Sequence, residues 1–117
     1  GNAVAHVGPG PVTESVDRNG YHLELHVSPN KAAAPNTFSL QIRKNGKPVS
    51  HATVIAGFSM LDMEMGTQSY TLPEHGLGLY GRSSPALVMV GHWGLSFEIT
   101  PPGQQPFTIV FVDRTTG

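Results

Sequence analysis

The stretch Tyr21-His22-Leu23-Glu24-Leu25-His26-Val27 alternates strictly between apolar and polar residues. Successive side chains of a β-strand point to opposite faces, so the four apolar residues share one face. The two histidines and the glutamate share the other. This pattern predicts a strand with one face in a core and the other in solvent.

The same alternation continues along the chain. Residues 38–43 alternate and run into Asn45-Gly46, a strong signal for a tight hairpin because type I′ turns need positive φ at both central positions. A return strand is expected from residue 48 to residue 56. Short strands are also expected over residues 69–72, 93–99 and 107–111. Two other segments are a loop over residues 28–36 and a glycine-punctuated strand or binding loop over residues 74–81.

One segment has a different pattern. Residues 85–90 form the continuous apolar run Pro-Ala-Leu-Val-Met-Val, which is typical of a strand buried on both faces. Strand-like segments therefore recur about every ten residues, with Gly, Pro and Asn between them, and no helix is expected. The sequence predicts an all-β, Ig-like antiparallel β-sandwich of about seven to nine strands.

The chain has 117 residues, enough for one compact domain. Residues 1–11 contain Gly8-Pro9-Gly10-Pro11 and are expected to form an entry arm, with a single domain over residues 12–117. The start at Gly1-Asn2-Ala3 lacks an initiator methionine and a leader, as expected of a processed protein or an excised domain. No apolar run reaches the ~20 residues that span a bilayer, so no membrane span is expected.

The overall charge excludes some partners. Charged residues are 13% of the chain and the formal net charge is −1, so nothing attracts a nucleic-acid backbone. The absence of cysteine excludes disulfides, thiolate zinc sites, iron–sulfur clusters and Cys-containing blue-copper centres.

Three of the four methionines, Met60, Met63 and Met65, lie within six residues and alternate with acidic residues. The fourth, Met89, lies three residues before His92. Thioethers and neutral imidazoles bind soft cations such as Cu(I). We therefore predict a copper site, with copper as Cu(I), built from these candidate ligands: Met60, Met63, Met65, Met89, His92 and His75.

The alternative is that the methionines fill a core. On an ideal strand Met63 and Met65 would point inward and Met60 outward. A bulge or a strand end near Leu61 would instead let three sulfurs approach one cation. The sequence leaves both interpretations open.

The remaining histidines are weaker candidates. His22, Glu24 and His26 share a strand face, but the outer two are ~13 Å apart at Cα, too far to chelate one ion without a bulge or help from another strand. A solvent-facing role is favoured for them, and His51 is a second-rank candidate. These residues leave open a second site, for Cu(II) or zinc.

The sequence offers little sign of catalysis. It contains no Gly-x-Ser-x-Gly elbow, no nucleophile placed beside a base, and no glycine loop ahead of a helix for phosphate. We therefore expect that the protein is not an enzyme.

Several motifs occur in a characteristic order: Gly46-Lys47-Pro48-Val49, Ala52-Thr53-Val54, the methionine cluster ending at Gly66, Gly78-Leu79-Tyr80, and Met89-x-Gly91-x-Trp93 ahead of a strand. Over residues 20–112 this order resembles the YtkA-like and FixH-like domains. These are small extracytoplasmic β-sandwich modules of bacteria, often tethered to the membrane or fused to copper-import proteins of the CopC/CopD type.

The resemblance implies an Ig-like fold and copper handling outside the cytoplasm, in transport, delivery or resistance. Its implied partners are a copper-transporting membrane protein or an oxidase assembly partner. By this resemblance the four methionines would be ligands. His92 stands at a position that varies between Gly91 and Trp93 in the family motif, and it is included on chemical grounds. Trp93 would be structural. Two alternatives without metal are a structural or interaction sandwich, and a peptide- or carbohydrate-binding module using Tyr80 and Trp93.

Overall fold

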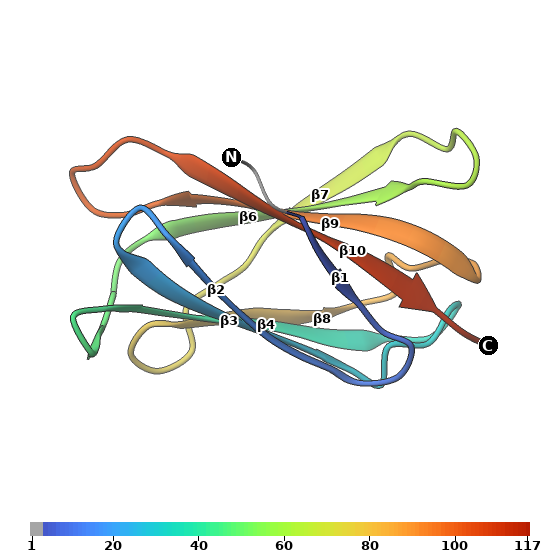
Figure 1. Ribbon diagram of the computed structural model, residues 1–117, viewed down its shortest axis with the longest axis horizontal. Helices are drawn as coiled ribbons and strands as arrows, with labels where there is room; N and C mark the ends of the chain where they lie inside the picture. Colours follow the sequence, from blue (N-terminus) through green and yellow to red (C-terminus); the bar gives the residue numbers. More distant parts are fainter. Residues whose placement is uncertain (1–3) are drawn as a thin grey trace.

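The computed structural model describes residues 4–117, which form ten β-strands in two layers (Figure 1). Residues 1–3 of the expected entry arm lie outside the described part. The described residues contain no helix that could cross a membrane. The strands are β1 (Ala5–Val7), β2 (Val12–Arg18), β3 (Tyr21–Ser28), β4 (Asn36–Lys44), β5 (Lys47–Pro48), β6 (Thr53–Met60), β7 (Thr67–Thr71), β8 (Leu79–Ser84), β9 (Gly91–Thr100) and β10 (Phe107–Thr115).

Each layer is a five-stranded sheet. The first sheet has the order β1-β10-β9-β6-β7, and the second has the order β2-β3-β4-β5 with β8 also paired to β4. All pairings are antiparallel except β1 with β10, which is parallel. The predicted all-β sandwich is confirmed, with ten strands instead of seven to nine.

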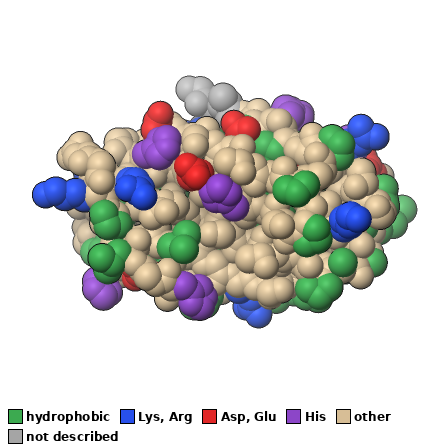
Figure 2. Space-filling view, turned by 90° about the horizontal axis from the view of Figure 1, so that it is seen from below, with side chains coloured by type: hydrophobic (Ala, Val, Ile, Leu, Met, Phe, Trp, Pro, Cys, Tyr) green, Lys and Arg blue, Asp and Glu red, His purple; other side chains and the backbone are tan. Residues whose placement is uncertain are grey.

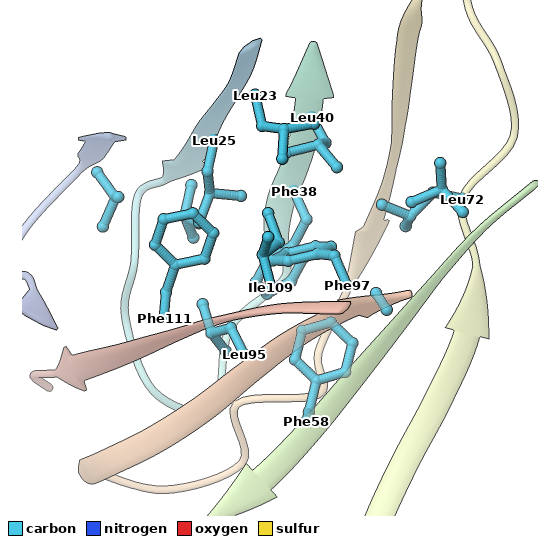
Figure 3. Packing of buried hydrophobic residues seen from close by; sticks show 14 of the residues in the cluster. Leu23, Leu25, Phe38, Leu40, Phe58, Leu72, Leu95, Phe97, Ile109 and Phe111 are labelled. Atoms are coloured by element: carbon cyan, nitrogen blue, oxygen red, sulfur yellow. The ribbon is translucent and has the colours of Figure 1, made fainter. Parts of the chain in front are cut away.

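The core lies between the inward faces of the two sheets (Figure 3). The alternation read from β3 is confirmed, because its apolar residues are buried and its polar residues are not. The rings of Phe38 and Phe58 face each other across the sheets, with centroids 4.8 Å apart. Fully buried side chains from both sheets complete the core: Leu23, Leu25, Leu40, Leu95, Phe97 and Phe111.

The expected hairpin at Asn45-Gly46 is confirmed. Both residues have positive φ, 52° and 76°, and Lys44 pairs with Lys47. The single return strand over residues 48–56 is wrong, however. The chain leaves the second sheet after two residues of β5 and enters β6 of the first sheet, passing through His51 with φ 61°. This crossover joins the two layers.

The buried strand predicted over residues 85–90 is also wrong. These residues form a loop that carries the chain from β8 in the second sheet to β9 in the first. Leu87 is buried, whereas Val88 and Val90 are 40% and 57% exposed.

The expected entry arm contributes a short strand to the first sheet, because β1 pairs with β10.

A buried polar pair ties the arm to the core. Asn30 Nδ2 donates to Asp113 Oδ1 and to the Gly10 carbonyl, each at 2.8 Å. Asp113 is inaccessible to solvent and pairs with Trp93 across β10 and β9. Asp113 Oδ2 and Asn30 Oδ1 are buried without a hydrogen bond from residues 4–117. Burial raises the pKa of the Asp113 carboxyl, against the weaker opposing effects of hydrogen bonds from Asn30 and the Arg114 amide.

This pair predicts a pH-dependent stability. The pKa of this carboxyl is higher in the folded protein than its unfolded value of 3.8. The protonated carboxyl therefore stabilises the fold at pH values below 3.8, and this stabilisation is lost as pH rises through the folded pKa. Replacing Asp113 by asparagine keeps the shape without the ionisation. In urea unfolding from about pH 4 to 8, Asp113→Asn should therefore gain stability relative to the parent as pH rises. A difference that stays constant with pH would contradict this.

Candidate metal site

The methionine cluster lies in the loop between β6 and β7. β6 ends at Met60 and β7 begins at Thr67, so residues 61–66 form the connection, here called the methionine loop. Met63 and Met65 are 53% and 48% exposed, whereas Met60 is only 8% exposed and belongs to the core. This is the reverse of the ideal-strand expectation, because the strand ends before the two outer methionines.

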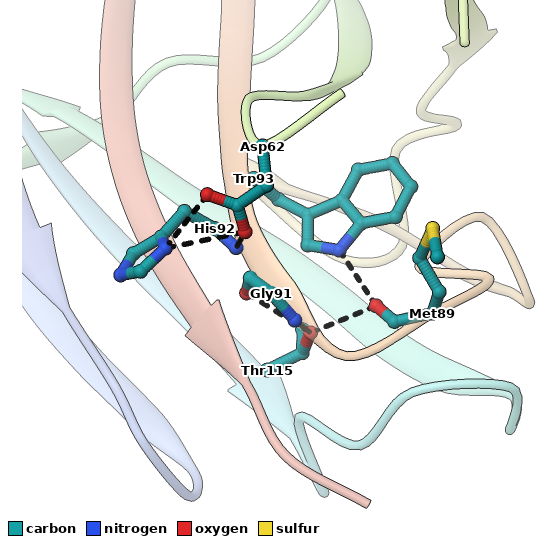
Figure 4. Close-up of polar contacts among 6 residues, drawn as sticks. All are labelled: Asp62, Met89, Gly91, His92, Trp93 and Thr115. Carbon is teal, nitrogen blue, oxygen red and sulfur yellow. Dashed lines mark hydrogen bonds and ion pairs between the residues drawn. The ribbon is translucent and has the colours of Figure 1, made fainter. Parts of the chain in front are cut away.

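Asp62 ties the methionine loop to the start of β9 (Figure 4). Its Oδ2 accepts the backbone N–H of His92 at 2.8 Å. Its two oxygens also lie 3.2 and 3.3 Å from His92 Nδ1. The backbone hydrogen bond from His92 is the main reason that the pKa of Asp62 lies below its ordinary value. Asp62 is therefore a carboxylate at neutral pH.

Gly91 makes room for this contact. A Cβ atom at Gly91 would lie 2.4 Å from Met60 Cε and 2.5 Å from Asp62 Oδ2, and the residue has φ 146°. Only glycine adopts this backbone conformation readily. The close approach of the methionine loop to β9 thus depends on a residue without a side chain.

Met89 and His92 lie on opposite sides of β9. The Trp93 Nε1–H donates to the Met89 carbonyl at 2.9 Å, and the Thr115 hydroxyl donates to the same oxygen at 3.1 Å. Met89 packs against the core, and Figure 4 shows its sulfur on the Trp93 side of the strand, with the His92 ring on the other. The predicted ligands Met89 and His92 therefore point away from each other.

The predicted ligands are divided between the two ends of the sandwich. One end of the sandwich holds the predicted ligands of the methionine loop, the 85–90 loop and the start of β9 (Figure 1). The other end holds the loop before β8. That loop carries His75, whose Nε2 hydrogen-bonds the Gly81 carbonyl at 3.0 Å. Glu74 accepts backbone N–H groups of His51 and Gly78, which lowers its pKa. These residues stabilise their own loop.

The histidines of β3 lie on the outer face of the second sheet, where Figure 2 shows imidazoles beside carboxylates. His26 Nε2 contacts Glu24 at 2.6 Å and its Nδ1 contacts the Thr13 hydroxyl at 3.3 Å. His22 Nδ1 contacts Asp17 at 2.8 Å. His22 and His26 therefore have separate partners. Within residues 4–117 no group of three or more His, Asp or Glu is arranged to hold a metal.

Two residues central to this end of the molecule were not predicted in their observed roles. In the sequence, Asp62 is one of the acidic residues between the methionines and Gly91 is part of the Met89-x-Gly91-x-Trp93 motif, and neither pattern indicates these contacts. The spacing between Asp62 and His92 gives no sign that they meet. The two aromatic residues of the carbohydrate alternative are both buried, Tyr80 at 1% and Trp93 at 3% exposure, so neither offers a ring to a sugar.

Comparisons with known proteins give one match. The sequence model of a family described as YtkA-like matches residues 15–98, which is more than half of the chain. No curated protein matches, and no solved structure matches.

Proposed function

Because the chain belongs to the YtkA-like family, we propose that it binds Cu(I) at the methionine loop and passes the ion to a partner protein. In this proposal Met63 and Met65 supply thioether sulfur and His92 supplies imidazole nitrogen. Met60 and Met89 support the loops from the core. The cargo is copper, and the domain acts by binding and release, not by catalysis.

The exposure of Met63 and Met65 carries the proposal. Methionine is apolar, and packing explains it when it fills a core. These two side chains are about half exposed in a six-residue loop, so packing does not account for them. Soft thioethers at the surface suit a soft cation. The hydrogen bonds of Asp62 place the same loop beside His92.

The site also suits release. A site without thiolate lets a competing partner exchange ligands at an exposed loop. The Asp62 carboxylate and Glu64 add negative charge that raises the local concentration of cations. We place this activity outside the cytoplasm, with a copper-transporting membrane protein or an oxidase assembly protein as the acceptor. No second site for Cu(II) or zinc on β3 is part of the proposal, because His22 and His26 have separate partners.

One observation favours a second candidate, a metal-free interaction module. Among residues 4–117, five of the eight exposed large hydrophobic residues belong to the methionine loop and the 85–90 loop: Leu61, Met63, Met65, Val88 and Val90. Exposed apolar surface often marks a protein interface. Such a module would use the methionines for contact and not for coordination.

Titration of the protein with Cu(I) against a competing chelator separates the two candidates. We expect one equivalent of Cu(I) to bind and to be returned to excess chelator, with no binding of Ca²⁺ or Mg²⁺, which prefer oxygen ligands. Absence of Cu(I) binding by the folded protein would rule out the metal proposal and favour the interaction module.

A further inference from the structure

We infer that Asp62 is a positioning residue that holds His92 in one tautomer, with its Nε2 free to bind a ligand. The contacts at Nδ1 carry this inference. An ionised carboxylate can only accept hydrogen bonds, and both Asp62 oxygens face His92 Nδ1 at 3.2 and 3.3 Å. Nδ1 therefore carries the proton, and in the neutral ring Nε2 keeps its lone pair.

The second nitrogen is available. No hydrogen bond from residues 4–117 reaches His92 Nε2, and the His92 side chain is about half exposed, at 54%. Figure 4 shows the far end of the ring pointing away from Asp62. His92 lines a groove of about 210 Å³ together with His6, Val112 and Arg114. Arg114 itself is exposed to solvent.

The same carboxylate positions both the ring and the loop. Asp62 accepts the backbone N–H of His92 through Oδ2, while Oδ1 is the nearer oxygen to Nδ1. The peptide at His92 and its imidazole are thus bound to one rigid group. Carboxylate–histidine pairs of this kind orient metal-binding histidines, and their loss typically weakens metal affinity by about 10–100-fold.

The variant Asp62→Asn tests this assignment. Its amide oxygen can still accept the His92 backbone N–H, but its NH₂ group would face Nδ1 and donate to it. The proton of the neutral ring would then move to Nε2. We expect ¹H–¹⁵N NMR of the metal-free protein, at about pH 8 where free imidazole is neutral, to show Nδ1–H in the parent and Nε2–H in Asp62→Asn. Cu(I) affinity should fall by about 10–100-fold.

The chain supplies a matched control. Asp17 contacts His22 Nδ1 at 2.8 Å on the other sheet, so Asp17→Asn makes the same chemical change far from the methionine loop. It should alter the tautomer of His22 and leave Cu(I) affinity unchanged.

The ligand role of Nε2 rests on the proposed function, whereas the tautomer does not. If the parent binds Cu(I) but Asp62→Asn keeps Nδ1–H or its full affinity, the positioning role is overturned and the proposed function stands. If the parent does not bind Cu(I), the proposed function and the ligand role of Nε2 are both overturned. The NMR result in the metal-free protein then decides the tautomer assignment alone.

Discussion

Changing Met63 and Met65 together to leucine is expected to weaken Cu(I) binding on the order of 100-fold, equal to about 2.7 kcal/mol. Leucine keeps an apolar side chain of similar size but has no sulfur to donate. Both side chains are about half exposed, so the free energy of unfolding should change by no more than about 0.5 kcal/mol. Chelator competition and thermal unfolding, measured on the same sample, test the two parts.

The two inner methionines provide the control. Met60→Leu and Met89→Leu, made together, conserve volume at buried and half-buried positions and should cost less than about 1.5 kcal/mol each. Their Cu(I) affinity should stay near that of the parent. If the inner pair abolished binding and the outer pair did not, the site would have to be placed between the sheets.

Replacing Trp93 by alanine is expected to lower the free energy of unfolding by about 3–5 kcal/mol. Trp93 is 3% exposed and pairs with Met60 on one side and Asp113 on the other, so its removal leaves a cavity at the end of the core. The loop at residues 85–90 would also lose the hydrogen bond from the indole to Met89. Urea unfolding at constant pH measures the loss.

The variant Trp93→Phe separates packing from hydrogen bonding. It retains a buried ring, and the Met89 carbonyl still accepts the Thr115 hydroxyl. Apart from the loss of buried ring area, the free energy of unfolding should therefore fall by about 1 kcal/mol, the net value of one hydrogen bond. A loss as large as that of the alanine variant would mean that the indole N–H, and not the buried area, holds this end of the sandwich together.

Local patterns were enough to predict much of the fold. The alternation of apolar and polar residues in β3, β4, β9 and β10 predicts which side chains are buried, because alternate side chains of a strand point to the same face and one face packs on the core. The turn at Asn45-Gly46 follows from its backbone conformations alone. Apolar composition was a poorer guide at residues 85–90, because a loop that crosses between sheets can carry apolar side chains that remain exposed.

The sequence by itself determined the class of fold and the presence of thioether and imidazole donors in a chain without cysteine. Only the tertiary structure decided which methionines face solvent, because that depends on where β6 ends and not on the spacing of the residues. The contact between Asp62 and His92 likewise joins positions thirty residues apart, because β6, which leads into the methionine loop, pairs with β9 only in the folded sheet. The register between strands is set by the packing of the whole core. The register in turn decides which residues meet at the candidate site.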